Sequence, residues 1–315
     1  MNKIDILQKE MAKAGYLIKK ASDISAETKQ RTGIFALDYV LDGGISMCEG
    51  GHRIELFGAE SSGKTTLALY IIKKWQEMNK LCVFIDAEKS YDKKWATQLG
   101  VDNKKLLIEY PDSLEQAGDF LVKIIPQVDL IVIDSLVGLI PTGESERDTG
   151  EPQVALSARV NSLICRKIYG ALGDRNVTFI FINQLREKVG TMYGNPYTTA
   201  GGHALKHMYN TRVEVKAGKP IEEKKEKIGK EMRFNCVKNK RGRPYRRTEA
   251  DFYLTGSIDN NKSLFYAGIK MGVIERSGNT YSFGEKKAVG QEKFTLELDD
   301  KDWVNIEKKI WELMK

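Results

Sequence analysis

The amino-acid sequence predicts an α/β protein: a mostly parallel β-sheet flanked by helices, with an N-terminal helical arm and a small α+β C-terminal domain. Three observations support this prediction. The chain has 315 residues, of which 41% are hydrophobic and 30% charged, enough to bury at least one large core. From about residue 33 to residue 212, short apolar runs alternate with longer segments of helical periodicity, which is typical of a parallel sheet covered on both faces. The 28 glycines and 7 prolines show neither a fibrous period nor a low-complexity bias.

The first 32 residues form a separate arm. An apolar stripe at helical spacing runs through it, followed by a polar stretch; the stripe consists of Ile4, Leu7, Met11, Ala14 and Ile18. Such a stripe has to be covered either by the protein's own domain or by a neighbouring subunit, and the sequence leaves both open. We assign residues 1–32 to subunit docking.

Four short apolar runs are the predicted strands of the core, which we assign to residues 33–255. Ligands of open α/β sheets bind outside the carboxyl ends of the parallel strands. We therefore expect the residues at those ends, Gly58, Glu88, Asp134 and Gln184, to converge on one crevice. The runs are RIELFG (53–58), LCVFIDAE (81–88), DLIVIDS (129–135) and VTFIFINQ (177–184).

After residue 212 the alternation of helix and strand fades. TRVEVKAG and MRFNCVKN are predicted as edge or hairpin strands on either side of the lysine-rich EEKKEKIGKE. Residues 256–315 are predicted to form the small α+β domain. Its last helix is expected to carry one apolar face, made by Trp303, Ile306, Ile310 and Leu313.

Charge and cysteine usage limit the functional classes. The net charge of +7 permits a polyanionic partner. The acid-free segment CVKNKRGRPYRRT (236–248) favours a surface that faces nucleic acid or phosphate, with a solvated loop as the alternative. The four cysteines lie far apart, and we find no apolar run of bilayer length and no signal peptide. The sequence therefore predicts a cytoplasmic protein without membrane attachment, zinc clasp or disulfide framework.

A phosphate-binding loop is the most specific motif. Residues 58–65 fit GxxxxGK[ST], follow a predicted strand and open a helix, which is the context that a P-loop requires. Glycines let backbone N–H groups approach phosphates, Lys64 is expected to reach the terminal phosphates, and the Thr65 hydroxyl is expected to bind Mg²⁺. The predicted loop, which would bind ATP, consists of Gly58, Ala59, Glu60, Ser61, Ser62, Gly63, Lys64 and Thr65.

Polar residues at the other strand ends complete a candidate ATPase site. Asp134 is expected to hold the metal with the help of Ser135, and a turn-capping aspartate is the alternative. Glu88 is the predicted general base, and Asp86, deeper on the same face, is its rival. Gln184 could contact the terminal phosphate, but a plain buried amide explains it equally well.

Taken together, these motifs resemble the RecA recombinase family of bacteria and their phages, from about Thr32 to the carboxyl end. The resemblance rests on five segments. They are GAESSGKTT (58–66), FIDAE (84–88), VIDSLVGLIP (132–141), FINQLREKVGTMYGNPYTTAGGHALK (181–206) and VKNK (237–240). It implies a RecA-type P-loop ATPase core.

The resemblance also implies roles for single residues. Glu88 would activate the hydrolytic water, and Gln184 would couple the nucleotide to DNA. Thr66 belongs to the nucleotide loop, and Asp92 and Trp95 would lie beside the adenine, with Trp95 replacing the family's usual tyrosine. Lys238 and Lys240 would reach across the subunit boundary to the terminal phosphate of the neighbour's ATP.

Two segments correspond to DNA-facing loops of the family, residues 144–155 and 185–206. The second is rich in glycine, which suits a segment that becomes ordered on a ligand. Backbone donors and arginines can grip phosphates without reading bases, so binding is expected to be largely independent of sequence. The family positions near the DNA strand are Arg159, Ser162, Arg166, Arg186, Gly201 and Gly202.

Besides Trp95, the chain departs from the family pattern in three places. Val154 replaces a methionine that wedges between bases, and Arg241 and Arg243 make the lysine loop more basic. The family's acidic tail is absent, so we expect readier binding to duplex DNA and a weaker dependence on magnesium.

The sequence thus predicts a DNA-dependent ATPase that forms helical filaments on single-stranded DNA, pairs it with homologous double-stranded DNA and exchanges strands. A ring-forming helicase of the same fold is the first alternative. The VKNK and GNPYTTAGG segments argue against it. The second alternative is a non-catalytic regulatory ATP module, which would not need glycine-rich DNA loops.

Overall fold

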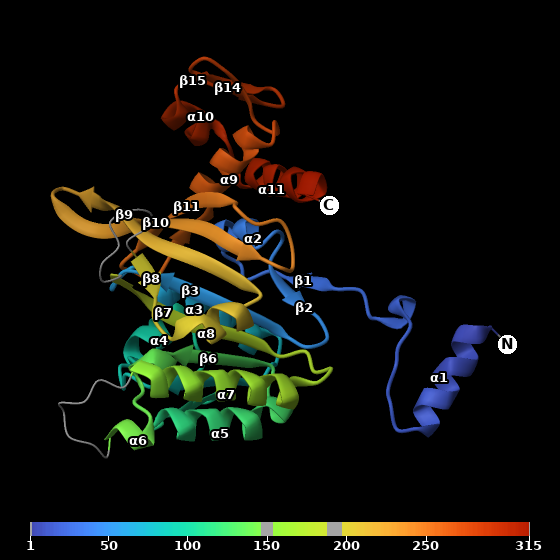
Figure 1. The fold of residues 1–315 in the computed structure, drawn as a ribbon. Coiled ribbons are helices and arrows are strands. Elements are labelled where there is room, and N and C mark those ends of the chain that lie inside the picture. The colour runs from blue at the N-terminus through green and yellow to red at the C-terminus, as the bar shows by residue number, and fades with distance from the viewer. Residues whose placement is uncertain (1, 146–153, 188–196, 315) are drawn as a thin grey trace.

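The structure is a computed structural model that describes residues 2–145, 154–187 and 197–314. Within these residues the centre of the molecule is a ten-stranded sheet (Figure 1). Its strands lie in the order β12 (Ile258–Asp259), β11 (Arg247–Tyr253), β10 (Glu226–Asn239), β9 (Thr211–Glu223), β3 (His52–Gly58), β7 (Thr178–Glu187), β6 (Leu130–Asp134), β4 (Cys82–Asp86) and β5 (Leu106–Glu109), and β8 (Tyr197–Thr199) pairs with β7. Neighbours from β9 to β5 run parallel, while β9 to β12 pair antiparallel, as do β7 and β8. The predicted mostly parallel sheet is confirmed.

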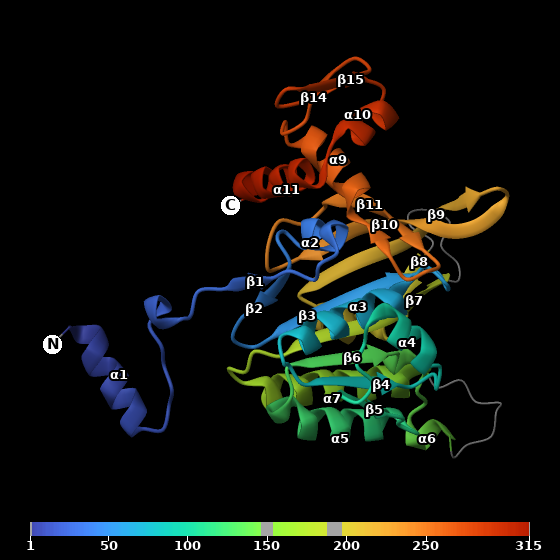
Figure 2. The same ribbon diagram turned by 180° about the vertical axis from the view of Figure 1, so that it is seen from behind.

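Helices cover both faces of this sheet. Successive strand residues point to opposite faces: Val83 and Ile85 of β4 pack with one layer of helices, and Phe84 packs with the other. The first layer, in front in Figure 1, consists of α5 (Leu114–Ile124), α7 (Val154–Leu172) and α8 (Gly202–Met208). The second layer, in front in Figure 2, contains α2 (Phe35–Val40), α3 (Lys64–Glu77) and α4 (Lys93–Leu99).

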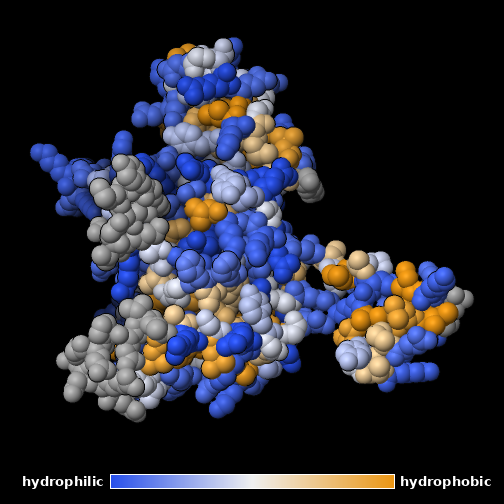
Figure 3. All heavy atoms as spheres, viewed as in Figure 1, coloured by the Kyte–Doolittle hydropathy of each residue, from blue (hydrophilic) through white to orange (hydrophobic). Residues whose placement is uncertain are grey.

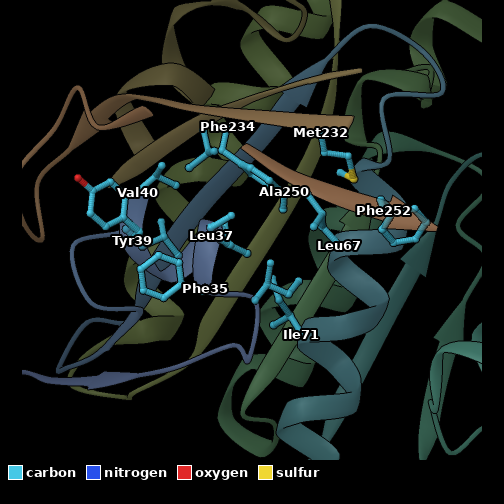
Figure 4. Close-up of a cluster of buried hydrophobic side chains, with 14 of the residues drawn as sticks. Phe35, Leu37, Tyr39, Val40, Leu67, Ile71, Met232, Phe234, Ala250 and Phe252 are labelled. Carbon is cyan, nitrogen blue, oxygen red and sulfur yellow. The ribbon is translucent and has the colours of Figure 1, made fainter. Parts of the chain in front are cut away.

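The larger core joins the second layer to the antiparallel half of the sheet. Side chains of α2 and α3 meet the facing side chains of β10 and β11 (Figure 4). This packing fixes α3, and therefore the loop that precedes it, against β10. The labelled residues of this cluster are Phe35, Leu37, Tyr39, Val40, Leu67, Ile71, Met232, Phe234, Ala250 and Phe252.

The remaining short helices are α6 (Thr142–Ser145) and the 3-10 turns at Ala21–Asp23, Ile125–Gln127 and Leu136–Gly138. None of the helices in the described ranges is long and apolar enough to cross a bilayer.

The N-terminal arm projects from the sheet. Its helix α1 (Lys3–Lys13) lies apart from the rest of the molecule in both ribbon views, and none of its residues is buried (Figures 1 and 2). Ile4 and Leu7 are 53% and 51% exposed, and the arm shows a hydrophobic face in Figure 3. The arm joins the core through β1 (Thr28–Gln30), which pairs with β2 (Ile45–Met47). Within the described residues, the stripe is not covered by its own domain.

The β9–β10 hairpin differs in detail from the sequence prediction. The lysine-rich segment does not lie between two separate strands, because β9 and β10 continue through it to a two-residue turn. Lys224 and Lys225 form this turn with φ values of 50° and 73°. Positive φ at both positions matches the twist of a hairpin. No glycine or asparagine marks the turn in the sequence.

The C-terminal segment, residues 260–314, combines helices with a small antiparallel sheet. Its elements are α9 (Asn260–Lys270), β13 (Glu275–Ser277), β14 (Thr280–Phe283), β15 (Lys286–Val289), α10 (Gln291–Glu297) and α11 (Asp300–Met314). Trp303, Ile306 and Ile310 of α11 are buried as predicted, but Leu313 is 58% exposed. Met314 is buried instead, because the buried face of α11 also includes Trp311 and is therefore rotated toward Met314 and away from Leu313.

Arginines of the basic segment 236–248 have partners inside the subunit. Arg246 pairs with Asp42 at 2.9 Å and stacks over the ring of Tyr39. Arg243 donates to the backbone oxygen of Met314 at 2.8 Å, at the end of α11. These two arginines therefore connect α2 and α11, and part of the segment is structural.

A buried carboxyl in α2 makes the stability of the fold depend on pH. Asp38 accepts hydrogen bonds from the backbone and hydroxyl of Thr32, and burial raises its pKa to about 7. A raised pKa means that the folded protein binds more protons than the unfolded chain between about pH 4 and 7, so stability falls as pH rises through that range. We expect Asp38→Asn to remove about 2–4 kcal/mol of this dependence. Urea unfolding of the unmodified chain and of Asp38→Asn at pH 5 and pH 8 measures this difference. If the free energy of unfolding changed equally with pH in both proteins, Asp38 would not be the source of the dependence.

Candidate nucleotide site

The loop from Gly58 to Thr65 joins β3 to α3, as predicted. A Cβ on Gly58 would lie 2.0 Å from the backbone oxygen of Val215, so only glycine fits there. Gly63 has a φ of 99° and lies against Met232 of β10. Both glycines are required because the loop approaches the sheet closely. The backbone N–H groups of the loop therefore lie at the amino end of α3.

Lys64 and Thr65 begin α3 in the positions that the motif requires. The Lys64 ammonium donates to the backbone oxygen of Ala59 at 2.7 Å, and burial lowers its pKa although Asp134 and Glu88 oppose this. The Thr65 hydroxyl donates to Asp134 Oδ2 at 2.7 Å. A lysine and a hydroxyl–carboxylate pair thus meet at one helix end.

The residues around Asp134 fit a bound magnesium ion. Burial raises the pKa of Asp134 to about 6, the charges of Glu88 and Asp86 add to this, and the Thr65 hydroxyl opposes it. A cation would offset the crowding of these carboxylates. Among the described residues there is no cluster of three or more His, Cys, Asp or Glu ligands. A hydroxyl and one carboxylate suit Mg²⁺, which takes few protein ligands and completes its shell with water and phosphate.

Glu88 and Gln184 come together beside this pair. Gln184 Nε2 donates to Glu88 Oε1 at 3.4 Å, and the Ser135 hydroxyl donates to the same oxygen at 3.4 Å. Glu88 is exposed, whereas its rival Asp86 is fully buried and accepts from the backbone N–H groups of Ser90 and its neighbour. The geometry therefore favours Glu88 as the carboxylate that faces the crevice. All four strand ends meet there, as the sequence predicted.

The indole of Trp95 contacts the segment that follows the nucleotide loop. Its indole N–H donates to Thr66 Oγ1 at 3.4 Å, and its ring contacts that of Phe252 in β11 at 6.4 Å between centroids. Asp92 is the N-cap of α4 and accepts from the backbone of Lys94 and Trp95. Trp95 thus joins the loop to the sheet, and Asp92 has a capping role in addition to any contact with a base.

A buried polar network behind Gln184 escaped the sequence analysis. Asn183 donates to Glu55 Oε1 at 2.9 Å and to the backbone oxygen of Ala200 at 3.1 Å. Arg212 binds the other oxygen of Glu55 and donates to Thr199 at 3.0 Å. The network therefore connects the strand carrying Gln184 to the end of the glycine-rich segment. The sequence feature that could have indicated this network is the charged Glu55 in the middle of the run RIELF.

Lys238 and Lys240 do not reach the nucleotide loop of their own subunit. In the sheet, Lys238 of β10 pairs with Arg212 of β9, and Arg212 pairs with Glu55 of β3. Glu55 lies three residues before the loop begins. The Lys238 ammonium donates to the backbone oxygen of Lys206 at 2.8 Å, on the sheet face covered by α8 rather than by α3. Burial lowers the pKa of Lys238, and Lys240 and Arg212 add to this. Lys240 is exposed.

The predicted DNA-binding residues that the structure describes gather around α7 and α8. Arg159, Ser162 and Arg166 share one face of α7, and both arginines are exposed. Gly201 and Gly202 begin α8 with φ values of 92° and 78°, and Gly202 lies beside Ala158 of α7. Arg186 lies opposite Thr198, where β7 pairs with β8. The side chain of Val154 and residues 146–153 and 188–196, which make up much of the two predicted loops, lie outside the described residues.

Comparisons with known proteins give a consistent result. Residues 2–259 match the family model of the RecA N-terminal domain. The chain is 39% identical over 289 residues to Protein RecA of Bacteroides thetaiotaomicron, which covers 90% of this chain and 87% of the relative. It is 42% identical over 266 residues to Protein RecA of Thermus aquaticus, covering 83% and 77% of the two chains. The corresponding protein of Aquifex aeolicus is 40% identical over 290 residues, covering 91% and 83%.

Proposed function

The chain belongs to the RecA family and functions in DNA recombination and repair, and we propose that it does so as a DNA-dependent ATPase that forms filaments. In this proposal it assembles on single-stranded DNA in the presence of ATP, pairs that strand with homologous double-stranded DNA and exchanges the strands. The meeting of Lys64, the Thr65–Asp134 pair and the Glu88–Gln184 pair at one crevice carries the proposal.

Each group in the crevice has a role in hydrolysis. Lys64 and the backbone N–H groups of the loop would hold the phosphates, and Thr65 and Asp134 would hold Mg²⁺, which would neutralise charge on the phosphates. Glu88 takes the proton of the attacking water. Gln184, which contacts Glu88, responds to the terminal phosphate. Trp95 presents a flat indole on which an adenine can stack.

We propose that the Glu55 network couples the nucleotide to DNA. The Gln184 backbone N–H donates to Asn183 Oδ1 at 2.9 Å, and Asn183 in turn holds the backbone at Ala200. A shift of Gln184 therefore acts on the residues that precede α8, where Gly201 and Gly202 would contact a phosphate backbone.

Assembly uses two surfaces of the subunit for contacts with its neighbours. We propose that Lys238 and Lys240 bind the terminal phosphate held by the adjoining subunit, while the exposed stripe of residues 1–32 packs on a neighbour. A head-to-tail contact of this kind uses different patches on each subunit and generates a helix when the rotation does not close. ATP favours this packing because its phosphate attracts cations from both sides.

A strand-exchange assay tests the proposal and separates it from the ring-forming helicase. We expect product with ATP, single-stranded DNA and a homologous duplex, and none with a heterologous duplex of equal length. A recombinase needs the match, because only base pairing tells the two duplexes apart when the protein grips the phosphate backbone. Equal product from both duplexes, or unwinding without exchange, would contradict recombination and favour a translocating motor.

A further inference from the structure

A second lysine lines the nucleotide loop, and it comes from a distant part of the sequence. A cavity of about 250 Å³ at the loop is lined by Ser61, Gly63, Lys64, Thr65, Thr66 and Lys230. Lys230 belongs to β10 and is partly buried. Its ammonium donates to the backbone oxygen of Ser61, in the middle of the loop.

The sheet fixes the direction of this lysine. Met232, two residues along β10, faces the same side as Lys230 and packs on Gly63. Lys230 lies directly opposite Phe252 of β11, whose ring contacts Trp95. Lys230 therefore pairs with a neighbour of Trp95, where a base would stack, while its ammonium reaches the loop that would hold the phosphates.

Among the residues that the structure describes, the surroundings of Lys230 provide no counterion for its charge. Burial lowers its pKa, and Lys227 adds to this. Within the ranges 2–145, 154–187 and 197–314, no carboxylate forms an ion pair with its ammonium. A backbone carbonyl compensates a partly buried cation only in part, because it carries no net charge. An anion in the cavity would compensate it better.

We propose that Lys230 is a second phosphate-binding lysine of this site, which donates to the nucleotide phosphate nearest the ribose. The inference rests on the proposed nucleotide-binding function and adds a ligand to it. Lys64 would act on the terminal phosphates, and Lys230 on the phosphate nearest the ribose, which is present in both ATP and ADP. The contact therefore strengthens the binding of both nucleotides to a similar degree and is made within one subunit.

Calorimetric titration of the full chain with ADP and with a non-hydrolysable ATP analogue, in the presence of Mg²⁺, tests the assignment. We expect Lys230→Ala to weaken both nucleotides by about tenfold, the size of one charge-assisted hydrogen bond at a partly exposed site. Lys230→Arg should recover most of the affinity, because it retains the charge. Lys227→Ala, an exposed lysine three residues away on the same strand, should change affinity less than about twofold.

The outcomes separate this inference from the function on which it rests. If Lys230→Ala and a second variant, Lys230→Gln, bind within twofold of the unmodified chain while Lys64→Ala loses binding, the role of Lys230 is overturned and the nucleotide site stands. If the unmodified chain binds neither nucleotide, both are overturned. An effect on the ATP analogue without one on ADP would place Lys230 at the terminal phosphate and contradict the proposed contact.

Discussion

Replacement of Glu88 by glutamine should lower the rate of DNA-stimulated ATP hydrolysis by about 10²- to 10⁴-fold, the contribution of a positioned general base. Glutamine has nearly the shape of glutamate and can still contact Gln184, but it cannot accept the proton of the attacking water. Filaments on single-stranded DNA should still form with ATP, because assembly depends on bound nucleotide and not on its cleavage. Turnover assays and electron microscopy of the same samples measure the two effects.

Glu77→Gln is the matched control. Glu77 is exposed like Glu88 but lies at the carboxyl end of α3, the end opposite the nucleotide loop. It should keep turnover within about twofold. Full hydrolysis by Glu88→Gln would mean that Glu88 is not the general base and would favour Asp86 for that role.

Replacement of Lys238 by alanine should abolish most of the DNA stimulation of ATP hydrolysis, by about 10²- to 10³-fold, as is usual when a donor to a developing charge is removed. The lysine is remote from the nucleotide loop of its own subunit, so nucleotide binding by the free subunit should persist. Hydrolysis with and without single-stranded DNA, together with calorimetric titration of ADP, measures both effects. Stimulation that remains unchanged would mean that Lys238 does not bridge subunits.

A mixture of the two variants isolates the shared interface. A Lys238→Ala subunit still supplies Glu88, and a Glu88→Gln subunit still supplies Lys238. An interface in which the first binds the nucleotide and the second adjoins it therefore contains both groups. In a random equal mixture about a quarter of head-to-tail contacts are of this kind, so about a quarter of normal activity should return. Activity no higher than the mean of the separate variants would place both groups in one subunit.

The sequence predicted the parts of the fold that depend on local patterns. The apolar run in LCVFIDAE forms β4, whose Val83 and Phe84 face opposite layers. The P-loop could be located because its glycines, Lys64 and Thr65 are contiguous and meet the backbone geometry that phosphate binding needs. The convergence of Glu88 and Gln184 followed from the rule that parallel strands end at the same edge.

The missed features depend on pairing between distant segments. Lys230 reaches the nucleotide loop only because β10 folds back beside β9 and packs on α3, more than 150 residues away in sequence. The Glu55–Arg212 pair likewise requires β9 to lie next to β3. The burial of Met314 in place of Leu313 depends on how α11 is rotated against α9, which helical periodicity limits but does not decide.

A density map of the filament on single-stranded DNA with a non-hydrolysable ATP analogue tests the central claim most directly. We expect the triphosphate to lie between two copies of the chain, with Lys64 from one subunit and Lys238 and Lys240 from the next within hydrogen-bond distance of its phosphates. A nucleotide enclosed by a single chain, with no side chain of the adjoining copy in contact, would contradict the account.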